Sequence, residues 1–105
     1  MRIEAITNHP AQLQNAINKA FKDNDLKTWS VKKNDKMEDR YTHTGQWEDK
    51  AIIKPELLTK KMTFTVIGWE NNPPNEATKG YYLGRFTEIL MVHFRNYFNH
   101  LETYA

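Results

Sequence analysis

The chain has 105 residues, a formal net charge of +2 and a hydrophobic content of 39%. That length suits one domain, since a second domain needs roughly another 50 residues. The absence of cysteine excludes disulfide scaffolds, thiolate metal sites and cysteine nucleophiles. No apolar run approaches the roughly 20 residues of a membrane span, and the first residues hold no signal-like apolar stretch. We therefore expect a single soluble, cytoplasmic domain over residues 1–105.

The N-terminal quarter predicts a short strand and then a helix. Arg2 to Ile6 alternates between apolar and polar residues, as in a half-buried strand. Asn8 is a good helix cap, and Pro10 is tolerated in a first helical turn. Apolar residues then recur at spacings of three and four, which indicates an amphipathic helix over about 10–23.

The middle of the chain predicts short strands joined by turns. Alternation around Trp29 and again around Tyr41 indicates two of them. A third over 51–54 should end at Pro55, because proline cannot donate a ladder hydrogen bond. Residues 56–60 are compatible with a helical turn or an edge strand, whereas 61–69 gives the clearest strand pattern.

The last third predicts a loop over 70–77 and a helix of about 25 residues from 78 to 103. Two consecutive prolines, Pro73 and Pro74, favour the loop. Apolar residues from Tyr82 to Leu101 form a broad stripe at helical spacing. Gly80 and Gly84 in this helix suggest a close approach to the sheet or to the first helix, which glycine permits.

This order of elements predicts an α+β fold, a two-layer sandwich. Consecutive strands with short connections pair most readily as a mainly antiparallel sheet of four or five strands. The N-terminal helix and the long C-terminal helix should cover one face. The other face, rich in threonine and lysine, should meet water.

The residues offer little for catalysis or metal binding. The only serine, Ser30, lies on the polar face of an expected strand with no base beside it. His93 and His100, two turns apart on the expected helix, are too far apart to share a metal ion. His93 is better explained as a packing residue of the apolar stripe. We therefore expect neither a metal nor a cofactor, and no enzyme. A pocket lined by His43, Trp47 and His93 is the remaining enzymatic possibility.

Protein binding is the function that the sequence favours. Tyr81 and Arg85 are four residues apart and should share a helix flank outside the apolar stripe, near Trp69 and the 70–77 loop. Tyrosine and arginine are enriched at binding hot spots. The composition resembles that of small bacterial or phage accessory proteins such as inhibitors, antitoxins and immunity proteins. A homodimer through an exposed strand edge or a spare part of the long helix is a further possibility.

Weak, non-specific nucleic-acid binding is the alternative. Residues 27–61 contain nine basic and six acidic side chains, an excess that the rest of the chain lacks. Lys32, Arg40 and Lys61 should lie on the polar face of the sheet, where they would contact phosphates. Threonine on that face is also explained by its strand propensity alone.

Overall fold

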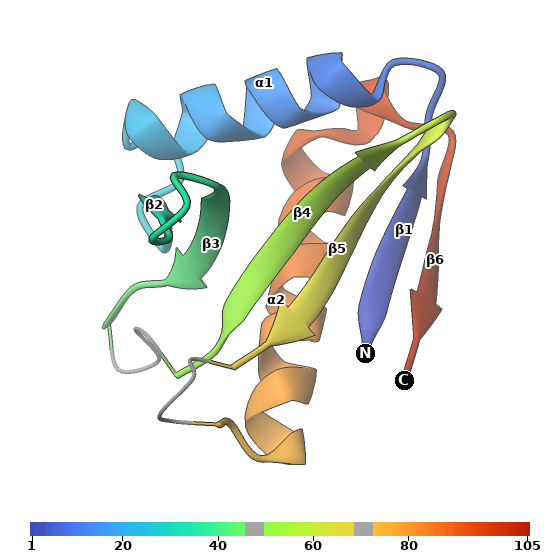
Figure 1. The fold of residues 1–105 in the computed structure, drawn as a ribbon. Coiled ribbons are helices and arrows are strands. Elements are labelled where there is room, and N and C mark those ends of the chain that lie inside the picture. Colours follow the sequence, from blue (N-terminus) through green and yellow to red (C-terminus); the bar gives the residue numbers. More distant parts are fainter. Residues whose placement is uncertain (46–49, 69–72) are drawn as a thin grey trace.

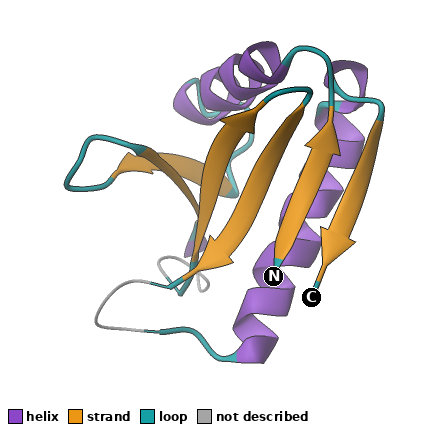
Figure 2. Ribbon diagram, turned by 45° about the vertical axis from the view of Figure 1, so that its right-hand side comes forward, coloured by secondary structure: helices purple, strands orange, loops and turns teal. Residues whose placement is uncertain are grey.

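The structure is a computed structural model that describes residues 1–45, 50–68 and 73–105. In this part of the chain, two α-helices cover one face of a six-stranded sheet (Figures 1 and 2). All paired strands are antiparallel, in the order β2-β3-β4-β5-β1-β6. The elements are β1 (Arg2–Ile6), α1 (Pro10–Lys22), β2 (Trp29–Lys33), β3 (Asp39–His43), β4 (Ile52–Leu58), β5 (Lys61–Ile67), α2 (Glu76–His93), the 3-10 turn η2 (Arg95–Tyr97) and β6 (His100–Tyr104). The α+β sandwich is confirmed, with six strands instead of four or five.

An aromatic core joins the two layers. The Phe86 ring of α2 lies 4.8 Å from Phe64 and 5.1 Å from Trp29, measured between ring centroids. Tyr41 packs parallel to Phe86 at 5.7 Å, and Phe21 of α1 meets the Tyr41 ring edge-on at 5.1 Å. Such pairs add to the free energy gained from burial alone. Of the 18 buried hydrophobic residues among those described, seven are aromatic, so rings supply much of the contact between the two layers.

Helix α1 forms as expected and differs only at its cap. It begins at Pro10, and the residue at the cap position is His9, not Asn8. The Thr7 hydroxyl accepts a hydrogen bond of 3.1 Å from the His9 backbone N–H. This bond satisfies the N–H of the cap residue itself, whereas no described side chain accepts from the N–H groups of the first turn, the role expected of Asn8.

Strand β4 passes through Pro55, where the sequence predicts its end. Pro55 lies opposite Phe64 in β5. Among the described residues, β3 and β4 are in register at Tyr41 and Ile53, so β4 is a local edge beyond Ile53. Proline is tolerated on an edge because its missing N–H has no ladder partner there. Residues 56–58 therefore continue the strand, and a turn at Lys60 follows with φ at +62°.

The expected 25-residue helix is wrong at its C-terminal end. α2 has 18 residues and ends at His93, and β6 follows after η2. Antiparallel pairing with β1 places Tyr104 opposite Arg2 and His100 opposite Ile6 (Figure 1). The apolar spacing at Phe94, Phe98 and Leu101 suits a helix equally well. Pairing with the otherwise open edge of β1 decides for a strand, a tertiary effect that local spacing does not report.

The face of the sheet away from the helices is less solvated than its threonines suggest. Thr63, opposite Glu4 on this face, is only 8% exposed. Thr42, expected on the same face, is instead completely buried against α2, with its hydroxyl 3.3 Å from both the Ala51 carbonyl oxygen and the Tyr82 hydroxyl. Glu4 is 7% exposed and receives hydrogen bonds from Arg2 and Lys61. The bond from Arg2 is the largest of the effects that hold the pKa of Glu4 below its usual range. Part of this face is therefore an ordered ion-pair surface.

Candidate partner-binding surfaces

Tyr81 and Arg85 lie in contact on one flank of α2. The guanidinium carbon of Arg85 is 5.3 Å from the centroid of the Tyr81 ring. A hydrogen bond with Tyr81 is the main cause of a raised pKa of Arg85. Arg85 also pairs with Glu88, at 3.5 Å. The shared flank expected from the sequence thus exists, whereas Trp69, expected beside it, lies outside the described residues.

His43 extends this flank onto the sheet. Its ring meets Tyr81 edge-on at 5.6 Å, and its Nδ1 lies 2.7 Å from the Thr44 carbonyl oxygen. His93 is exposed at the far end of α2, about 18 Å along the helix from Tyr81 at 1.5 Å per residue. His93 is therefore not the packing histidine expected, and His43 and His93 do not share a pocket. Trp47 lies outside the described residues.

The sequence suggested that the two glycines of α2 let the helix approach its neighbours closely, but the structure shows no such approach at either position. Both Gly80 and Gly84 are exposed. A Cβ atom added at either position would meet no atom within 4 Å. Close packing therefore does not require glycine at these two positions.

The three basic residues considered for nucleic-acid binding fall into two places. Lys32 and Arg40 are opposite each other on β2 and β3. Arg40 lies 3.7 Å from a Glu38 carboxylate oxygen, and its side chain is only 11% exposed. Lys61 lies on β5 and pairs with Glu4 at 3.3 Å. Arg40 and Lys61 are thus already paired within the fold.

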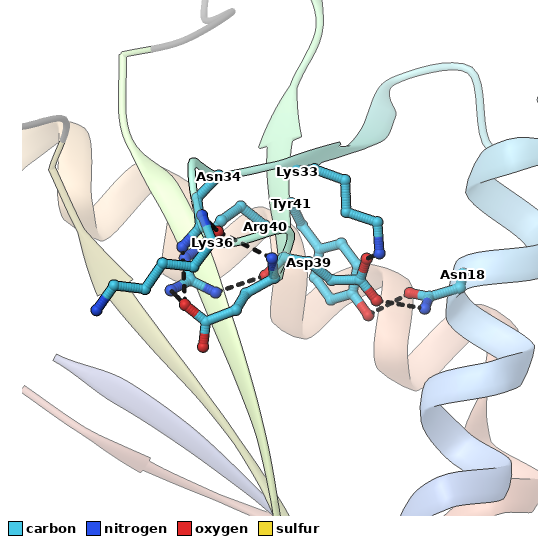
Figure 3. Close-up of polar contacts among 8 residues, drawn as sticks. Asn18, Lys33, Asn34, Lys36, Asp39, Arg40 and Tyr41 are labelled. Carbon is cyan, nitrogen blue, oxygen red and sulfur yellow. Dashed lines mark hydrogen bonds and ion pairs between the residues drawn. The ribbon is translucent and has the colours of Figure 1, made fainter.

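A polar network ties the β2–β3 hairpin to α1 (Figure 3). The Tyr41 hydroxyl donates to Asn18 Oδ1 at 2.5 Å, and Asn18 Nδ2 donates to Asp39 at 2.8 Å. Lys33 pairs with the other Asp39 oxygen. Burial raises the pKa of Tyr41, and the charge of Asp39 adds to the effect. The phenol stays protonated and donates, so the network is a structural clamp.

The hairpin turn beside this clamp is held by Asn34, whose Oδ1 accepts from the backbone N–H groups of Lys36 and Glu38 (Figure 3).

Within the described ranges, no group of three or more histidine and acidic side chains is arranged to hold a metal ion. No described helix is long and apolar enough to cross a membrane.

An apolar groove of about 510 Å³ lies between α2 and β6. Its walls include Thr87 and Met91 of α2, Arg95 and Phe98 of the connection, and Leu101 and Thr103 of β6. Met91 is 46% exposed, a high fraction for a large apolar side chain. The Thr87 hydroxyl donates to the Leu83 carbonyl within the helix, so that wall offers no unused hydroxyl donor. The helix expected over 98–103 left no place for this groove, which forms only because residues 100–104 are a strand.

The groove adjoins an unpaired strand edge. β6 is the last strand of the sheet and pairs only with β1 among the described strands (Figure 2). β2, at the opposite edge, carries Lys32 and Lys33, and lysine is a common guard against unwanted strand pairing. β6 carries no lysine. The less guarded edge is therefore the one beside the apolar groove.

Comparison of the chain with protein-family models, with curated proteins and with solved structures finds no match.

Proposed function

We propose that this protein is a small, non-enzymatic protein-binding module. The observation that carries the proposal is the apolar groove of about 510 Å³ beside the unpaired edge of β6. An edge strand next to a hydrophobic groove offers main-chain hydrogen bonds and side-chain pockets together, which is how several peptide-binding domains work. The size and composition of the chain favour a cytoplasmic accessory protein of a bacterium or phage, such as an inhibitor, antitoxin or immunity protein.

The Tyr81–Arg85 flank is the second surface that supports this proposal. Arginine held over a tyrosine ring is preorganised for contact with a partner, since less side-chain entropy is lost on binding. Trp69 remains part of this predicted surface.

Cross-linking in cells of the source organism tests the function. The tagged full chain is cross-linked before lysis, and linked peptides are mapped by mass spectrometry. We expect one partner whose links fall near α2 and β6 and whose recovery is lost with Met91→Lys. Val92→Lys is the matched control, because Val92 is 64% exposed on the same helical turn and does not line the groove.

Three outcomes are informative. Loss of the partner with Arg85→Glu but not with Met91→Lys would move the interface to the Tyr81–Arg85 flank. A partner that survives both substitutions would contradict both surfaces. Failure to recover any specific partner would contradict the function itself.

A further inference from the structure

The groove and the free edge of β6 are parts of one surface. Leu101 and Thr103 lie on the strand and line the groove, with His100 at its end, whereas Glu102 lies opposite Glu4 on the other face of the sheet. A chain laid along β6 would therefore alternate in the same way. Every second side chain would enter the groove between β6 and α2, and the others would lie on the Glu4 face.

The groove carries an unpaired positive charge. Arg95 is exposed, and no described carboxylate forms an ion pair with it. None of the residues that line the groove is acidic, so an acidic group there would meet the Arg95 cation without a competing carboxylate from the lining. Charge complementarity therefore favours an acidic segment over a basic one.

A second copy of this chain does not supply that acidic group. In a β6–β6 pairing, the groove-facing residues of the incoming strand would again be Leu101 and Thr103. Its carboxylate, Glu102, would lie on the opposite face, where it already bonds with His100 at 2.9 Å and Tyr104 at 2.7 Å. The occupant is better matched by a different sequence.

We infer that the groove binds an extended segment of a partner protein, which adds to β6 as a further strand. Its groove-facing positions are apolar and include one aspartate or glutamate beside Arg95. Met91, Phe98 and Leu101 provide the apolar contacts, and the β6 edge provides main-chain hydrogen bonds. This inference rests on the proposed function and names the class of partner.

A displayed library of random peptides tests this inference on the full-length protein. Peptides of about 12 residues are long enough to cover β6. We expect selected peptides with apolar residues at alternate positions and at least one acidic residue among them. Arg95→Glu should weaken their binding roughly tenfold or more, whereas Arg85→Glu on the other flank should change it little. Met91→Lys should abolish binding, and Val92→Lys should not.

Hydrogen exchange of the same complex locates the peptide. Strand addition should slow exchange of backbone amides within 100–104, because edge amides gain partners. Selected peptides that are basic, that bind Arg95→Glu as well as the wild type, or that leave these amides unprotected would overturn the inference. So would a library that yields no binder. A cross-linked cellular partner found alongside any of these results would leave the proposed function standing and reject only its assignment to this groove.

Discussion

The guanidinium carbon of Arg2 lies 4.0 Å from the centre of the Tyr104 ring, across the seam between the first and last strands. Arg2 also bonds with Glu4 at 3.0 Å, and the Tyr104 hydroxyl bonds with Glu102. The two ends of the chain are thus held side by side by contacts on the helix-free face. These contacts anchor the strand that forms one wall of the groove.

Tyr104→Ala should lower the free energy of unfolding by about 0.5–1 kcal/mol, the usual value of an exposed cation–π contact. Urea denaturation followed by circular dichroism measures the change. Tyr104→Phe keeps the ring over Arg2 and loses only the bond with Glu102, so it should retain most of the stability. Equal losses in the two variants would show that the ring contact contributes nothing.

Asn18→Ala should cost about 1–3 kcal/mol of unfolding free energy, because it leaves the Tyr41 hydroxyl and one Asp39 oxygen without their partner. Asn15→Ala, an exposed position on the same helix, is the matched control. Adding Tyr41→Phe to the Asn18 variant should recover part of the loss, since the unsatisfied hydroxyl is removed. Additive effects of the two substitutions would contradict the clamp.

Asp39 should make stability fall in acid. Burial opposes its ionisation, but hydrogen bonds from Lys33 and Asn18 outweigh this and leave the pKa below its ordinary value of 3.8. A lowered native pKa contributes stability above that ordinary value, which is lost as the pH falls toward the native pKa. Denaturation at several pH values between about 5 and about 2 should therefore show a shallower decline for Asp39→Asn than for Asp35→Asn. Parallel curves would argue against a stabilising Asp39 carboxylate.

Gly84→Ala should raise the free energy of unfolding by roughly 0.5–1 kcal/mol. The position is inside α2, its φ is not positive, and a new Cβ would touch nothing. Alanine restricts the unfolded chain and has the higher helix propensity. Thermal denaturation measures the gain, and a destabilised variant would show that the glycine has a packing role in α2.

Nucleic-acid binding remains open to a direct test. Because Arg40 and Lys61 are paired internally, we expect no saturable micromolar binding of random-sequence DNA or RNA at about 50 mM salt. Fluorescence anisotropy with single- and double-stranded probes measures it. Binding that weakens steeply toward about 200 mM salt and is lost with Lys32→Glu would restore the nucleic-acid alternative.

Elements with an unambiguous hydrophobic period can be predicted from local spacing. α1 and the strands β1 and β5 follow from spacings that only one kind of element satisfies. The contact between Tyr81 and Arg85 also follows, because a spacing of four residues on a helix brings side chains together. Such local patterns were enough to predict the α+β class and the Tyr81–Arg85 flank.

The tertiary structure alone decided what the ambiguous segments became. Phe94, Phe98 and Leu101 fit a helix by spacing, yet the open edge of β1 makes residues 100–104 a strand. Pro55 is tolerated within β4 because the described residues of β3 pair with β4 at Ile53, which leaves an open edge at Pro55. Pairing between distant strands is a non-local interaction that no short window of sequence contains. The groove between α2 and β6 depends on that pairing, so it was beyond the reach of the sequence.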